Sequence, residues 1–114
     1  MATQKYLVML RNVPGKQEAL TPDQMKEMYG ALAAWQTKYA ANIADMGGKL
    51  SSDGRVVAAT QIMDGPFAET KEVVAGFIVI AAESYEQAIE VTRQCPGVMR
   101  PGTSIEVRQI MTSA

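Results

Sequence analysis

The chain has 114 residues, 47% of them hydrophobic and 20% charged, and its net charge is −1. This length predicts one domain, residues 1–114, large enough to bury a core without disulfides or metals. The weak net charge and the scattered Lys and Arg residues exclude the basic face that nucleic-acid binding needs. No apolar run approaches the roughly 20 residues of a membrane span, and the segment from Met1 to Tyr6 lacks a signal-peptide core, so we expect a cytoplasmic protein.

Histidine is absent from the chain, and cysteine occurs once. The lack of histidine excludes imidazole general bases, Ser-His and Cys-His nucleophiles and most zinc sites. Cys95 has no partner for an intrachain disulfide. A lone cysteine is most often a small buried hydrophobe, which favours a packing thiol over a reactive one. We expect neither a metal nor a cofactor.

The first elements are a strand and a long helix. In a strand from Lys5 to Leu10, successive side chains would point to opposite faces, and both faces would be apolar. This predicts a central strand that is covered on both sides. After a polar loop, Thr21-Pro22-Asp23-Gln24 has the form of a capping box with proline at the first helical position. An apolar stripe at three- and four-residue steps then predicts a helix that ends at Gly47-Gly48; its members are Met25, Met28, Leu32, Trp35, Tyr39, Ile43 and Met46.

In the middle of the chain the sequence pattern predicts strands. Lys49 to Ser52 is a candidate short strand before the Asp53-Gly54 turn signal, and Val56 to Met63 is a longer one. Val73 to Ala82 is the most apolar run, again with both faces hydrophobic, so we expect it to be central. Gly76 inside this run indicates a close backbone approach or a bulge.

In the last third of the chain the sequence pattern predicts a helix and an edge strand. Ser84 and Gln87 repeat the capping-box spacing, and Pro96-Gly97 stops the helix that follows. Ser104 to Met111 alternates between apolar and polar residues, as a half-buried edge strand does.

The predicted order is strand, helix, strand, strand, helix, strand. This is the α+β, ferredoxin-like βαββαβ arrangement of an antiparallel sheet with two helices on one face. The two helices can cover only one face of the sheet, yet two of the strands are apolar on both faces. The second face therefore needs another layer to cover it. The simplest cover is the sheet of a second copy, so we expect a homodimer through sheet-to-sheet packing, in the form of a dimeric α/β barrel.

The segment from Asp64 to Glu72, Asp-Gly-Pro-Phe-Ala-Glu-Thr-Lys-Glu, carries the candidate chemistry. Three carboxylates, Asp64, Glu69 and Glu72, could shift one another's pKa in a dry pocket and shuttle a proton beside a carbonyl. Lys71 and Arg108 could hold a substrate carboxylate. Alternatively, Asp64 caps a turn, and the other charges form a solvated face of little energetic value.

This segment resembles the signature of the YCII-related, or DGPF-domain, family, and the resemblance runs from Tyr6 to the closing Ile105-Glu106-Val107-Arg108. It implies a dimeric α/β barrel. Better-known members are thought to use a His-Asp pair in chlorinated-lactone and muconolactone-type chemistry. Asp64 matches the aspartate of the motif, but no histidine exists here to match its partner.

Three functions follow as hypotheses. The first is a small homodimeric domain with a small-molecule pocket between the sheet and the signature loop, lined by Asp64, Phe67 and Arg108, with Tyr6, Glu69 and Lys71 as further candidates. The second is a cofactor-free enzyme in which Asp64 transfers a proton on a small organic acid or lactone. The third is a regulatory module, since members of the family often occur alongside sigma factors.

Overall fold

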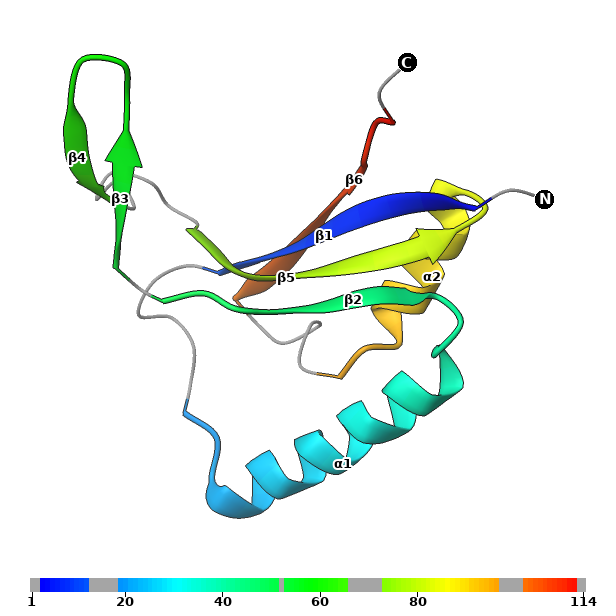
Figure 1. Cartoon of the computed structure of the whole chain (residues 1–114). Coiled ribbons are helices and arrows are strands. Elements are labelled where there is room, and N and C mark those ends of the chain that lie inside the picture. The colour runs from blue at the N-terminus through cyan, green and yellow to red at the C-terminus, as the bar shows by residue number, and fades with distance from the viewer. Residues whose placement is uncertain (1–2, 13–18, 52, 66–72, 97–101, 113–114) are drawn as a thin grey trace.

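The structure, a computed structural model, describes residues 3–12, 19–51, 53–65, 73–96 and 102–112. It is an α+β chain with two helices and a mainly antiparallel sheet (Figure 1). In chain order the elements are β1 (Gln4–Asn12), α1 (Pro22–Lys38), β2 (Ile43–Lys49), β3 (Gly54–Val57), β4 (Ile62–Gly65), β5 (Val73–Ala82), α2 (Tyr85–Arg93) and β6 (Thr103–Gln109).

Four strands form the main sheet in the order β2-β5-β1-β6, and each neighbouring pair is antiparallel. The two strands predicted to be central, β1 and β5, occupy the two inner positions, and β6 is an edge strand as predicted. This order is compatible with a ferredoxin-like fold. The remaining strands, β3 and β4, pair only with each other and form a separate hairpin between β2 and β5.

Helix α1 begins as predicted but ends earlier. Thr21 and Gln24 form the capping box, with the Gln24 amide 3.1 Å from Thr21 Oγ1 and the Thr21 amide 2.9 Å from Gln24 Oε1. The prediction that the helix continues to Gly47-Gly48 is wrong, because it ends at Lys38 and the chain turns into β2. Asn42 directs this turn: its backbone and side chain both bond the backbone of Ala81 in β5, at 2.7 and 2.9 Å.

Two further strand predictions are corrected. Lys49 to Ser52 is not a separate strand, since Lys49 is the last residue of β2 and no strand is assigned at Leu50 or Ser51. Val56 to Met63 is not one strand but the two arms of the hairpin, joined by a turn in which the Ala58 amide donates to the Gln61 carbonyl at 2.7 Å. Alternation alone does not reveal such a turn, because Ala58 and Ala59 continue the apolar run of Val56 and Val57, and neither glycine nor proline marks the turn.

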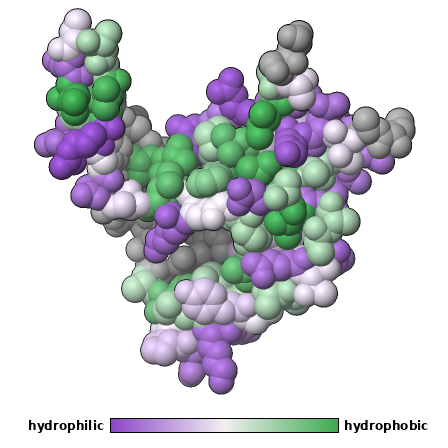
Figure 2. Space-filling view, viewed as in Figure 1, coloured by the Kyte–Doolittle hydropathy of each residue, from purple (hydrophilic) through white to green (hydrophobic). Residues whose placement is uncertain are grey.

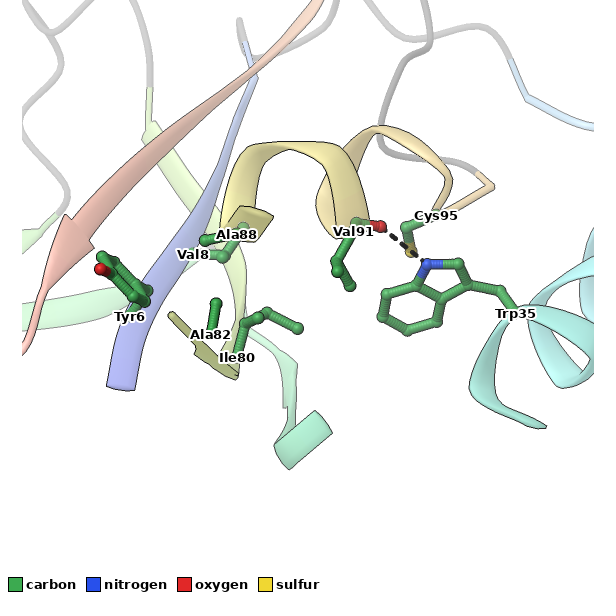
Figure 3. Packing of buried hydrophobic residues seen from close by; sticks show 8 residues of the cluster. All are labelled: Tyr6, Val8, Trp35, Ile80, Ala82, Ala88, Val91 and Cys95. Carbon is green, nitrogen blue, oxygen red and sulfur yellow. Dashed lines mark hydrogen bonds between the residues drawn. The ribbon is translucent and has the colours of Figure 1, made fainter. Parts of the chain in front are cut away.

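The core lies between one face of the sheet and the two helices (Figure 3). Tyr6, Val8, Ile80 and Ala82 come from β1 and β5, Ala88 and Val91 from α2, Cys95 from the segment after α2, and Trp35 from α1. The Trp35 indole N–H donates to the Val91 carbonyl at 2.9 Å, so it joins the two helices through a buried hydrogen bond. Trp35 is the only buried residue of α1.

Helix α2 starts at the predicted cap, where the Ser84 hydroxyl accepts from the Gln87 amide at 3.1 Å. The Gln87 side chain accepts from the Glu83 amide at 2.7 Å rather than closing the box on Ser84. On α2, Ala88, Val91 and Thr92 are buried, and Tyr85 and Ile89 at the rim are 42% and 41% exposed.

The molecule is flat and open. Its extents are 48 × 44 × 18 Å and its radius of gyration is 15.8 Å, against about 13 Å for a compact domain of this length. The chain exposes 8192 Å² of surface, whereas a folded monomer of this mass exposes about 6,100 Å². The difference is about 2,000 Å² of surface that a compact monomer of this size would bury.

Candidate functional site

Asp64, the leading candidate from the sequence, lies in β4 on the β3–β4 hairpin. It pairs with Arg55 across the hairpin, and its Oδ1 is 3.4 Å from Arg55 Nε. The Arg55 and Asp64 side chains are 61% and 92% exposed, so this ion pair contributes no more than about 1 kcal/mol to stability. The Asp64 carboxylate is therefore solvated, and Arg55 is its cationic neighbour within the described part of the chain.

The other candidates in the signature segment fall outside the described residues. Phe67, Glu69, Lys71 and Glu72 are in this group, so the convergence of the three carboxylates stays a prediction. Within the described part of the chain, no group of three or more Cys, Asp and Glu side chains is close enough to hold a metal ion.

Tyr6 is a core residue on the helix side of the sheet. Its side chain is 2% exposed, and its ring meets the Tyr85 ring edge-on with 4.8 Å between centroids. The Tyr85 hydroxyl in turn accepts from the Gln109 amide at 2.9 Å. The Tyr6–Tyr85 pair therefore joins β1, α2 and β6 at this end of the core.

Arg108 lies on the opposite face of the sheet from Tyr6. It is exposed on the edge strand β6 and is in register with Leu7 of β1. Its neighbour Val107 packs against the core, and successive side chains of a strand point to opposite faces. The structure thus does not bring Tyr6 and Arg108 together within one chain, and Asp64 is on neither of their strands.

The face of the sheet that carries Arg108 has an apolar centre. We call it the open sheet face and define it by four partly buried side chains, Leu7, Met9, Phe77 and Val79. Two rows of paired residues cross this face from β5 through β1 to β6. One row contains Val79, Leu7 and Arg108, and the other contains Phe77, Met9 and Glu106. No described helix packs on it, because both helices contribute to the core on the other face (Figure 1).

Charged groups border the open sheet face at the β6 edge. Glu106 Oε1 is 3.1 Å from Arg11 Nη1, and both side chains are partly exposed. Arg108 adds a second cation one row further along β6. The apolar centre was predicted from the sequence, which named Arg108 as a candidate but did not place it on this face. The Arg11–Glu106 ion pair was not, because the two residues are separated by most of the chain and only the β1–β6 register joins them.

A concave region lies between α1 and β2. It is a hollow of about 310 Å³, open to solvent and lined by Gln36, Ala40, Ile43 and Met46. The Gln36 amide nitrogen is 3.5 Å from the Met46 sulfur across it. Sequence analysis missed this hollow because it placed Ile43 and Met46 on the same helix as Gln36.

Cys95 is buried at 4% exposure, and desolvation raises the pKa of its thiol to about 11. The thiol therefore stays protonated at neutral pH and is a poor nucleophile. This confirms the prediction of a packing cysteine rather than a reactive one.

Comparison with known proteins places the chain in a family. The sequence model of the YCII-related domain matches residues 5–113. An uncharacterized protein of Rhizobium meliloti (strain 1021) is 30% identical over 117 aligned residues, which cover 92% of this chain and 90% of that protein. No helix in the described part of the chain is long and apolar enough to cross a membrane. The matched region includes both central strands, the hairpin and the closing strand, and the chain therefore belongs to the YCII-related domain family.

Proposed function

We propose that the chain acts as a homodimer, a dimeric α/β barrel, that binds a small organic acid between its two sheets, near the loop of the Asp64 signature. The observation that carries this proposal is the open sheet face. Its four apolar side chains are only partly buried although they belong to the two central strands of the sheet. A sheet face of this kind is normally packed against another layer.

The exposed area supports a second copy as that layer. Each chain exposes about 2,000 Å² more than a folded monomer of its mass, which leaves room for an obligate homodimer interface of about 2,000 Å² or more in total. The net charge of −1 sets up little repulsion between copies.

The class of ligand follows from the border of the open sheet face. Arg108 is an exposed guanidinium at the end of an apolar row formed by Leu7 and Val79. Guanidinium groups bind carboxylates through two parallel hydrogen bonds, which an apolar and water-poor surrounding strengthens. A small molecule with an apolar body and one carboxylate fits this combination.

Binding is favoured over catalysis by the state of Asp64. A carboxylate that shuttles protons is usually desolvated or placed among other charges, and Asp64 is 92% exposed, with Arg55 as its ion-pair partner among the described residues. The chain has no histidine to supply the alternative base. Proton transfer by Asp64 and a regulatory role beside sigma factors stay predictions.

The dimer is tested by light scattering at micromolar concentration, where we expect twice the chain mass of 12.3 kDa. Val79→Asp places a charge in the centre of the open sheet face and should give a folded monomer. Met25→Asp is the matched control, since Met25 is 39% exposed on α1 and lies outside the proposed interface. A wild-type monomer, or a Val79→Asp dimer as tight as the control, would refute the proposal.

The ligand is tested by a thermal-shift screen of small apolar acids, each paired with its uncharged methyl ester. A ligand that binds only the folded protein raises the melting temperature. We expect acids to do so and esters not, and we expect Arg108→Gln to remove the response to acids while leaving the melting temperature without ligand unchanged. Equal responses to acids and esters would contradict the role of Arg108.

A further inference from the structure

Two cationic side chains share one corner of the open sheet face, at the end of the sheet where β1 begins and β6 ends (Figure 1). Arg108 of β6 is paired with Leu7 of β1, and Lys5 precedes Leu7 by two positions. Residues two positions apart in a strand point to the same face. Lys5 is therefore on the open sheet face, next to the row that contains Arg108.

Lys5 and Arg108 are diagonal neighbours across the β1–β6 pair. The Lys5 carbonyl accepts from the Ile110 amide at 2.8 Å, so Ile110 lies beside Lys5, and Arg108 is two positions before Ile110. Diagonal neighbours of this kind are about 7 to 8 Å apart, a distance that long side chains bridge. Both side chains are exposed. The ammonium and the guanidinium can therefore turn toward the same bound group.

The carboxylate nearest to Arg108 along β6 is already engaged elsewhere. Glu106 is two positions before Arg108 and on the same face, but its Oε1 is 3.1 Å from Arg11 Nη1. Among the described residues, neither Lys5 nor Arg108 forms a salt bridge. Neighbouring like charges repel each other, so this corner attracts an anion.

Other carboxylates at this end of the sheet lie on the far side of β1 from Arg108. Asp45 is level with Arg108 but belongs to β2, the opposite edge strand. Three strand spacings, about 14 Å, separate these two edges. Glu83 follows the end of β5, the strand that pairs with the other side of β1. The described part of the chain therefore leaves the positive charge of the corner uncompensated.

Apolar surface adjoins the corner. Leu7 and Val79 belong to the row that contains Arg108, and Ile110 beside Lys5 is 40% exposed. In Figure 2, apolar surface over the sheet borders hydrophilic surface toward the two ends of the chain. An apolar surrounding lowers the effective dielectric constant and strengthens the attraction between a cation and an anion. The corner therefore suits a ligand with an apolar body and a concentrated negative charge.

We propose that Lys5 and Arg108 together bind the head of a doubly charged acid, with either two adjacent carboxylates or one phosphate group. Arg108 holds two oxygens of this head through parallel hydrogen bonds. Lys5 contacts a further oxygen as a point charge. This inference rests on the function proposed above, because it concerns the same Arg108 site, and it names the class of acid that the site selects.

The charge of the ligand is tested by isothermal titration calorimetry with four probes that share a benzene ring. Phthalate and phenyl phosphate are dianions at slightly alkaline pH, and monomethyl phthalate and methyl phenyl phosphate are the matched monoanions. The titrations use low salt, because salt screens exposed charges. We expect at least one dianion to bind about tenfold or more tightly than its own monoanion, as one further charged hydrogen bond provides. The pair that shows this advantage identifies the head as dicarboxylate or phosphate.

The role of Lys5 is tested by Lys5→Gln. Lys5 is exposed, so the melting temperature without ligand should stay close to that of the wild type. We expect this variant to lose the advantage of the dianion and to keep the affinity for the monoanion, whereas Arg108→Gln should weaken the binding of both. Lys26→Gln is the matched control. It makes the same change in net charge at an exposed position of α1, on the other side of the sheet, and should keep the advantage.

The outcomes separate this inference from the function on which it rests. If monoanions bind through Arg108 but neither dianion binds more tightly, the proposed function stands and the doubly charged head is refuted. An advantage that survives Lys5→Gln, or that Lys26→Gln removes equally, would overturn the role of Lys5 in the site. If Arg108→Gln changes the binding of none of the four probes, the proposed function and this inference fall together.

Discussion

Gly47 should not tolerate a side chain. It lies in β2 with φ of +63°, in the left-handed region that residues other than glycine rarely adopt. A Cβ atom built there would overlap with the Phe77 carbonyl oxygen of β5. Its neighbour Gly48 has ordinary φ and nothing within 4 Å of such a Cβ, so Gly48→Ala is a control one residue away.

The expected loss for Gly47→Ala has two parts. The left-handed conformation costs about 1 to 2 kcal/mol with a side chain present. Relieving the contact requires β2 to move by more than 1 Å relative to β5, and overpacking of this kind costs about 1 to 3 kcal/mol. The sum is about 2 to 5 kcal/mol, a large part of a typical unfolding free energy of about 5 to 15 kcal/mol.

Thermal and urea unfolding of the two variants measure this difference. A loss of about 3 kcal/mol corresponds to a fall in melting temperature of about 12 °C in a domain of this size. Gly48→Ala should change stability by less than about 1 kcal/mol. If Gly47→Ala melts within two or three degrees of Gly48→Ala, about 1 kcal/mol or less, the bulged pairing of β2 with β5 is not as described.

Three other predictions concern the core and β5. Gly76→Val should lower the melting temperature, because a Cβ at Gly76 would be 3.0 Å from the Gly48 carbonyl oxygen; a melting temperature equal to wild type would show that β2 yields easily. Trp35→Phe should cost about 1 to 3 kcal/mol in urea unfolding, since it leaves the buried Val91 carbonyl without its donor; no loss would mean that water replaces the indole. The Cys95 thiol has its pKa raised from 9.0 to about 11 by burial, so the unfolded state ionises first as pH rises. The free energy of unfolding should fall by about 2 to 3 kcal/mol between pH 9 and 11. The Cys95→Ala variant should lose much of this fall. If the variant and the wild type show the same dependence on pH, the raised pKa of the Cys95 thiol is contradicted.

The candidate site was predictable only in part. The apolar open sheet face follows from β1 and β5, whose both-sided hydrophobicity is visible in the sequence. The separation of Tyr6 from Arg108 is not visible, because it depends on which face of each strand the helices cover. The position of Asp64 on an exposed hairpin depends on the turn at Ala58 to Gln61, a stretch that carries neither glycine nor proline.

The sequence by itself determined the elements whose signals are local. The caps at Thr21 and Ser84 and the apolar runs of β1 and β5 specify their structures through hydrogen bonds and packing within a few residues. Only the tertiary structure decided the fate of Ile43 to Lys49, whose apolar spacing equally suits a helix. Pairing with β5 and the bonds between Asn42 and Ala81 satisfy this segment's backbone as a strand, and such long-range hydrogen bonds outweigh a local periodicity worth only a few tenths of a kcal/mol per residue.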